Sequence, residues 1–345
     1  MSSISLGVVL AILAGILNGS FAAPVKYAKV WKWENLWSVW AVFGMVVFPW
    51  LVVLATIPHP LAVYEGGGAR NLFMLIAFGI GFGLAQIFFG LGIAAVGMAL
   101  NFAIAIGLST VLGSLLPLLV QHRERVYTPQ GGMIFLGVFL VLVGIVGCAA
   151  AGKFKETHLA ASDPRPRESS AVKMSFAAGL VLVILAGIGS PLTNFGLAFG
   201  DALRDVAGRQ GVSPASQANV IWAPLNTAAF IPYIIYCLYL WKKNNTASLF
   251  RVPGTGRNWL FGALMAMFWF ASTVIYGAVS ASLGRMGPIV GWPLFMSAII
   301  ITSNVWGLAT GEWKGAGRPA LNTMFGSIFF LILGFGALAY ASALG

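Results

Sequence analysis

Charged residues are scarce in this sequence, and their scarcity excludes most soluble folds. Only 8% of the 345 residues are Asp, Glu, Lys or Arg, whereas 59% are hydrophobic. Soluble domains carry about a quarter charged residues, so the composition predicts an integral membrane protein. Cysteine is also rare: Cys148 and Cys237 lie in apolar stretches and indicate neither a disulfide framework nor a metal site.

Acidic residues are fewer than basic ones, 9 against 20, which gives a net charge of +11. The basic residues lie between apolar stretches, so they indicate cytoplasmic loops rather than a nucleic-acid-binding surface. No charged side chain falls near the middle of an apolar stretch. This absence argues against the charged ring of an ion channel and against the clustered acids and histidines of an enzyme. We therefore expect no enzyme activity and no cofactor or metal.

Long uncharged intervals predict ten membrane-spanning helices. A span needs roughly 20 apolar residues, so each interval holds one helix, except the longest, which holds two. Those two are expected at 72–92 and 98–120, with a break at Gly97. The apolar runs are continuous rather than alternating, which favours helices over a β-barrel. The intervals are 1–25, 35–64, 71–122, 126–152, 174–200, 210–241, 258–284, 286–311 and 319–345.

The distribution of basic residues predicts how the chain crosses the bilayer. Fourteen of the 20 Lys and Arg residues fall in loops that follow odd-numbered helices. The positive-inside rule therefore places these loops in the cytoplasm and both termini on the periplasmic side. The first apolar segment follows no basic region, so we interpret it as a retained helix rather than a signal peptide.

A weak internal repeat predicts two five-helix halves, 1–152 and 174–345, joined by a flexible cytoplasmic linker at 153–173. Because each half has an odd number of spans, the second copy would enter the membrane upside down, as in secondary transporters. Chance resemblance between Gly-rich helices is the alternative. The residues that match at shifts of 187 to 189 are Gly90, Gly97, Glu124, Gly137 and Gly147 with Gly277, Gly284, Glu312, Gly326 and Gly336.

Neutral polar residues inside the predicted spans indicate a neutral, hydroxyl-rich substrate. Polar groups are costly in lipid and tend to face a bundle interior, where amides also serve to join helices. Trp269 shares a predicted helix face with Ser272, Thr273 and Tyr276, and an indole face can stack on a pyranose ring. The candidate substrate-binding residues are Asn18, Gln86, Asn101, Asn194, Trp269, Ser272, Tyr276 and Trp292.

Proline and glycine interrupt two of the later spans. The "GSP" stretch at 189–191, and Pro224 and Pro232, are expected to break or bend their helices. Backbone groups freed at such breaks can contact substrate, although simple kinking explains them equally well.

Three stretches resemble the L-rhamnose–proton symporter family of the drug/metabolite transporter superfamily. They are "APVKYAKVWKWENLWSVW" (23–40), "FGLAQIFFGLGIAAVGMALNFAIAIGLSTVLGSLLP" (82–117) and "GEWKGAGRP" (311–319). The resemblance implies an all-α fold of two inverted five-helix repeats in the bacterial inner membrane. It also implies uptake of L-rhamnose or a similar pyranose by proton symport with alternating access. The alternative is a facilitator or exporter of another small neutral metabolite without proton coupling.

Proton coupling requires a titratable group, and all nine carboxylates lie in loops or at span ends. Glu34 is a candidate because "WKWENLW" surrounds it with tryptophans that can desolvate it. A helix-start carboxylate favoured by the helix dipole is the alternative for Glu34. His122 is the second candidate, because an unperturbed imidazole titrates near pH 6.5. The expected partners are a sugar, a proton and the bilayer, with the chain as a monomer or homodimer.

Overall fold

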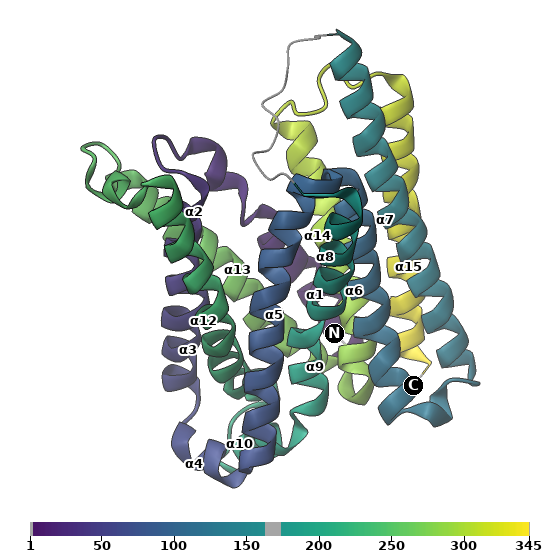
Figure 1. Cartoon of the computed structure of the whole chain (residues 1–345). Coiled ribbons are helices and arrows are strands. Elements are labelled where there is room, and N and C mark those ends of the chain that lie inside the picture. Colours follow the sequence, from purple (N-terminus) through teal and green to yellow (C-terminus); the bar gives the residue numbers. More distant parts are fainter. Residues whose placement is uncertain (1–2, 163–173, 345) are drawn as a thin grey trace. The chain divides into compact units, whose positions relative to one another are not determined.

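The computed structural model describes residues 3–162 and 174–344, and this part of the chain is helical with no strand (Figure 1). The helices of the first half are α1 (Ser3–Ser20), η1 (Ala23–Tyr27), α2 (Trp33–Ala41), η2 (Val42–Val47), α3 (Phe48–Thr56), α4 (Pro60–Gly66), α5 (Ala69–Val96), α6 (Met98–Gln121), η3 (Arg123–Arg125) and α7 (Pro129–Ser162). Those of the second half are α8 (Phe176–Gly189), α9 (Leu192–Phe199), α10 (Asp201–Arg209), α11 (Pro214–Gln217), α12 (Asn219–Asn244), η4 (Ala247–Arg251), α13 (Gly256–Ser282), η5 (Gly284–Met286), α14 (Gly287–Ala309) and α15 (Arg318–Ala343).

Ten helical stretches of the described residues are long and apolar enough to cross a membrane, which confirms the predicted number of spans. The expected pair between residues 71 and 122 is α5 and α6, and the break between them is Gly97. Gly97 has a φ of +86°, in the left-handed region. Glycine reaches this conformation without the steric cost that a Cβ atom imposes, so the chain can end one helix and begin the next within one residue.

The predicted flexible linker is shorter than the sequence indicated. Helix α7 continues through Ser162, so the part of the linker that begins at Lys153 is helical. Lys, Glu, Leu and Ala are strong helix formers, and "KFKETHLAAS" (153–162) adds them directly to an apolar span with no Gly or Pro to stop it. The rest of the predicted linker, 163–173, lies outside the described residues.

The expected interruption is confirmed as a break in the sixth span, whereas the prolines of the seventh span do not break their helix, and whether they bend it stays a prediction. The sixth span is broken at "GSP", with α8 ending at Gly189 and α9 beginning at Leu192. By contrast, α12 runs without a break through Pro224 and Pro232. The second span also changes geometry, because the π-helical segment η2 separates α2 from α3 just before Pro49. Proline has no N–H to donate to the preceding turn, which favours such a local change in helical pitch.

The helices form two compact units, each assembled from two segments that are far apart in the sequence. Unit 1 consists of Met1–Leu84 and Leu192–Arg285, and unit 2 of Ala85–Pro191 and Met286–Gly345. This division differs from the predicted sequence halves, 1–152 and 174–345, which describe a duplication rather than a packing unit and stay a prediction.

Unit 2 is built around the antiparallel pair α7 and α15, which lie side by side along most of their length (Figure 1). Gly137, Gly144 and Gly147 of α7 lie against Leu338, Leu331 and Ser327 of α15. A Cβ atom on any of these glycines would overlap the partner's side chain, so glycine allows the two backbones to approach closely. The pair is closed at one end by Gln130, whose amide donates to the carbonyl of Ala341 at 3.1 Å.

Unit 1 is joined by polar side chains and aromatic rings rather than by glycine alone. Trp50 of α3 donates to the hydroxyl of Thr227 on α12 at 2.9 Å. Asn219, at the start of α12, donates to Thr56 at the end of α3, so the second span and α12 run antiparallel. Helix α1 packs along α13, which carries most of the predicted site residues of this unit.

Candidate functional site

Five of the predicted substrate-binding residues come together on and around α13 in unit 1. Asn18 of α1 donates its amide to the hydroxyl of Ser272 at 2.8 Å, and that hydroxyl donates to the carbonyl of Trp269 at 2.6 Å. One turn further along α13, the hydroxyl of Tyr276 donates to the amide oxygen of Asn194 on α9 at 2.5 Å. We call these five residues, Asn18, Asn194, Trp269, Ser272 and Tyr276, the α13 cluster.

The exposure of the α13 cluster falls from one end to the other. Asn18 and the indole of Trp269 are half-buried, whereas Ser272, Tyr276 and Asn194 are buried. The bond from Asn18 uses one amide hydrogen and leaves the amide oxygen to accept a hydroxyl. A half-buried amide beside a half-buried indole is suited to a ligand with hydroxyl groups on one side and C–H groups on another.

Trp40 of α2 joins this cluster, although the sequence analysis did not select it. Its ring packs edge to face against Trp269, with centroids 5.0 Å apart, and against Trp37 at 5.1 Å. Phe21 lies at 6.2 Å from Trp40. The signal was present in the sequence, because Trp33, Trp37 and Trp40 follow one another at spacings of four and three, which places them on one helix face.

Several buried donors in unit 1 have no hydrogen-bond partner among the described residues. One is the indole nitrogen of Trp40, and two others are the indole nitrogen of Trp222 and the amide nitrogen of Asn226 on α12. An unsatisfied buried polar group costs roughly 1 to 3 kcal/mol. Such groups therefore mark places where water or a ligand completes the hydrogen bonding.

The three other predicted residues lie in unit 2 and do not form one cluster. Trp292 of α14 is buried, donates to the carbonyl of Ser109 on α6 at 2.9 Å, and packs where Gly113 has no side chain. Asn101 is fully buried, and neither its amide nitrogen nor its oxygen has a partner among the described residues. Gln86 of α5 is half-buried. Their roles as substrate contacts stay predictions.

Glu34, the first candidate for proton coupling, is buried at 3% exposure near the start of α2. One of its carboxylate oxygens accepts hydrogen bonds from Asn244 at 2.9 Å and from Thr246 at 2.7 Å. Its backbone carbonyl accepts a third bond from the indole of Trp241 at 3.1 Å. All three donors are neutral, so the ionised carboxylate is hydrogen-bonded without an Arg or Lys partner in these contacts.

His122, the second candidate, lies in the turn between α6 and η3. Its Nδ1 atom is 3.4 Å from the carboxylate of Glu124, which is exposed. A hydrogen bond with its own backbone, and the neighbouring His122, hold the pKa of Glu124 below its ordinary value. Within the described residues, no group of three or more His, Cys, Asp or Glu side chains is placed to bind a metal ion.

Comparison with known proteins gives a consistent set of relatives. The sequence model of one protein family, described as L-rhamnose-proton symport protein, matches residues 1–340. An L-rhamnose-proton symporter from Cronobacter sakazakii is 27% identical over 330 residues, which cover 94% of this chain and 93% of the relative. Symporters of the same name from Escherichia coli and Yersinia pestis are 26% and 27% identical and cover 94% and 91% of this chain, respectively, and the same shares of their own lengths.

Proposed function

Because the chain belongs to the L-rhamnose-proton symport protein family, we propose that it carries L-rhamnose, or a similar neutral pyranose, into the cell together with a proton. The family is one of membrane transporters rather than enzymes, in agreement with the ten apolar helices. The observation that carries the proposal is the α13 cluster. Its five residues bring amides, hydroxyls and an indole together on and beside α13, and none of the five is charged.

The chemistry of the α13 cluster matches that of a deoxysugar. The free amide oxygen of Asn18 accepts a sugar hydroxyl, and the Trp40 N–H supplies a donor that has no other partner among the described residues. The half-buried ring of Trp269 offers an apolar face to ring C–H groups and to the methyl group that distinguishes a 6-deoxysugar. A neutral site of this kind distinguishes one sugar from another because a wrong sugar would leave some of its hydrogen-bonding groups without a partner.

Inverted repeats and alternating access form part of the proposal. Three pairs of corresponding spans pack antiparallel: the second span with α12, α6 with α14, and α7 with α15. Antiparallel packing of equivalent helices is what a duplication with opposite membrane orientation produces, and such repeats commonly rock about a substrate site. We place the protein in the bacterial inner membrane with both termini periplasmic, on the basis of its loop charges.

Glu34 is the proposed carrier of the coupled proton. It is the only carboxylate that is buried in the described part of the chain. Its side chain accepts hydrogen bonds from Asn244, the last residue of α12, and from Thr246, in the segment that links α12 to α13, the helix of the cluster. A buried carboxylate with neutral partners can gain and lose a proton without breaking a salt bridge. Because Thr246 lies in the segment that leads into α13, a change in the protonation of Glu34 can shift the helix that binds the sugar.

The test of sugar transport is uptake of radiolabelled L-rhamnose into proteoliposomes, with and without an inward proton gradient. Accumulation that requires the gradient is expected for the wild-type protein. Asn18→Ala should weaken rhamnose binding roughly tenfold, because one hydrogen bond to a sugar hydroxyl is lost. Asn322→Ala, an exposed Asn of α15, is the matched control and should bind as the wild type does.

Two results would change the proposal. Rhamnose equilibration that ignores the proton gradient would support a facilitator or exporter without coupling. Glu34→Gln separates coupling from binding, because the Gln oxygen still accepts the bonds from Asn244 and Thr246 but cannot exchange a proton. We expect this variant to bind rhamnose and to lose gradient-driven accumulation. Retained accumulation would assign Glu34 a purely structural role.

A further inference from the structure

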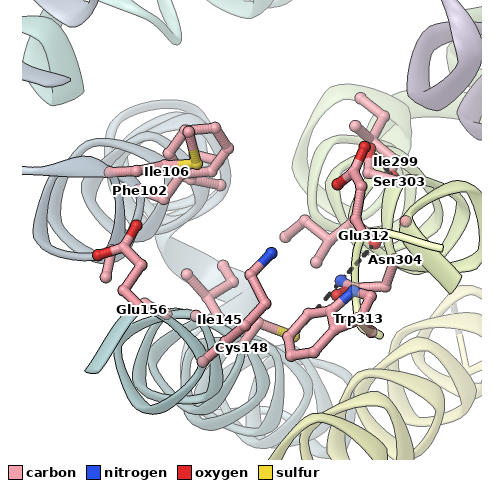
Figure 2. A pocket seen from close by; sticks show the side chains of 17 residues that line it. Phe102, Ile106, Ile145, Cys148, Glu156, Ile299, Ser303, Asn304, Glu312 and Trp313 are labelled. Atoms are coloured by element: carbon pink, nitrogen blue, oxygen red, sulfur yellow. Dashed lines mark hydrogen bonds between the residues drawn. The ribbon is translucent and has the colours of Figure 1, made fainter. Parts of the chain in front are cut away.

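A pocket of about 220 Å³ lies entirely within unit 2, between α6, α7, α14 and the turn that precedes α15 (Figure 2). It contains none of the predicted site residues and takes no part in the proposed sugar site. Its inner wall is mainly apolar and includes Phe102, Ile106, Ile145 and Ile299, while Ser303 and Asn304 of α14 are polar lining residues. Its outer wall, at the ends of α7 and α14, carries charged side chains, so the pocket is amphipathic along its length.

The charged side chains of the pocket are Lys155 and Glu156 on α7 and Glu312 in the turn after α14. Trp313, in the same turn, lies beside them. The ammonium group of Lys155 lies 4.8 Å from the centre of the Trp313 ring. Glu156 and Glu312 are on opposite sides of the pocket in Figure 2. One ammonium group and two carboxylates therefore surround the opening, which is where a lipid headgroup would lie relative to these helix ends.

The depth of the pocket follows from helix geometry. Ile145 lines its inner end and Lys155 its outer end on the same helix. Ten residues at 1.5 Å per residue separate these levels by roughly 15 Å. Met98 and Phe102, on the lining part of α6, are among the exposed apolar residues, so the pocket opens beside a surface that the membrane covers. Such a slot can hold part of one acyl chain below a headgroup.

We propose that this pocket binds a zwitterionic phospholipid with a primary amine, that is, phosphatidylethanolamine. Its phosphate would pair with Lys155, while its ammonium group would donate to Glu156 and Glu312. An anionic headgroup such as phosphatidylglycerol satisfies only the lysine and is repelled by two carboxylates. The quaternary ammonium of phosphatidylcholine cannot donate hydrogen bonds to them.

Native mass spectrometry of the delipidated protein in detergent tests this site, with phosphatidylethanolamine, phosphatidylcholine and phosphatidylglycerol added separately. The wild-type protein should retain phosphatidylethanolamine most strongly. Gly152→Leu places a side chain in the pocket, where a Cβ atom meets nothing within 4 Å, and should weaken this binding at least roughly tenfold by displacing buried methylenes. Gly132→Leu is the matched control, because Gly132 lies on the same helix, also in open space, but outside the pocket.

The charge argument has its own variants. Glu156→Gln and Glu312→Gln together should abolish the preference for phosphatidylethanolamine over phosphatidylglycerol while leaving the cavity open. Equal phosphatidylethanolamine binding by the wild type and Gly152→Leu would overturn the site. Phosphatidylglycerol binding as tight as that of phosphatidylethanolamine in the wild type would overturn the proposed headgroup. Neither result depends on whether the protein transports rhamnose.

Discussion

In unit 1 tryptophan rings and polar side chains join helices beside the glycine contacts of α5 with α12, whereas in unit 2 the longest helix pair meets mainly through glycine. The Trp40–Trp269 contact and the Asn18–Ser272 bond are examples of the first kind, and the contact of Gly144 with Leu331 is an example of the second. Close backbone packing leaves no room for a ligand, because each surface fills the other. Indole and amide groups that have hydrogen-bonding capacity to spare can instead bond to a ligand. This difference agrees with our proposal that unit 1 recognises the sugar, with the α7–α15 pair in a supporting role.

The largest expected effect is a loss of stability on filling the glycine contact of unit 2. In Gly144→Leu, the new Cβ atom would lie 2.6 Å from Cγ of Leu331 and 3.0 Å from the carbonyl oxygen of Ser327, so the helices must separate. We expect a loss of about 3 kcal/mol, seen as a lower Tm by fluorescence-detected gel filtration. Gly336→Leu on α15 is the control, because nothing lies within 4 Å of its Cβ position and it should keep or raise the Tm. Equal Tm values for the two variants would show that close glycine packing does not hold α7 against α15.

A smaller effect on stability is expected from a comparison of two buried tryptophans, of which one donates a hydrogen bond and the other, within the described part of the chain, does not. Trp292→Phe in unit 2 breaks the bond to the carbonyl of Ser109, whereas Trp40→Phe in unit 1 removes an N–H that has no partner among the described residues. Both variants lose the same ring volume, so the difference in their unfolding free energies reports the hydrogen bond. We expect Trp292→Phe to be less stable by about 1 to 2 kcal/mol.

Rhamnose binding by these two variants sharpens the comparison further. Trp40→Phe should weaken the affinity for rhamnose measured by isothermal titration calorimetry, because the removed N–H is the proposed sugar donor. An unchanged affinity would return Trp40 to a packing role. If Trp292→Phe also binds rhamnose more weakly, the predicted sugar contact of Trp292 stands, and recognition extends to unit 2.

The smallest expected effect lies at the exposed turn of unit 2. The lowered pKa of Glu124 means that the folded protein favours its ionised form, so this stabilisation is present above the ordinary pKa of 4.5 and is lost as the pH falls through the folded value. The Tm of Glu124→Gln should therefore be slightly below that of the wild type at about pH 7, and the difference should shrink as the pH falls below 4.5 through the lowered folded-state pKa. A difference that grows on acidification would contradict this assignment. The double variant with His122→Gln shows whether the imidazole contributes.

Much of the fold could be predicted because hydropathy is a local property. Ten spans, the break at Gly97 and the shared face of Trp269, Ser272 and Tyr276 all follow from residue order and helical period. The end of α7 was misplaced because a charged run was interpreted as a loop, although its residues are strong helix formers. The continuity of α12 through two prolines shows that neighbouring helices can support a span that local rules would break.

The candidate site was only partly predictable, since its residues acquire partners from distant segments. Residue type indicated that Asn18, Asn194 and Tyr276 were polar groups needing partners within a membrane, but not that Tyr276 would bond to Asn194. Glu34 was expected to be desolvated by tryptophans, yet its side chain is held by Asn244 and Thr246. Trp40 was not selected from the sequence, although it shares one helix face with Trp33 and Trp37.

By itself, the sequence determined the class of protein, the number and limits of most spans and the neutral character of their polar residues, because these depend on composition and on periods of a few residues. Only the tertiary structure decided which amide meets which hydroxyl, which indole nitrogen has no partner among the described residues, and where the pocket between α6, α7 and α14 opens. Nearly every face of such helices is apolar, so hydropathy does not specify neighbours. Glycine contacts and the few polar bonds select them, and those act only once the helices have packed.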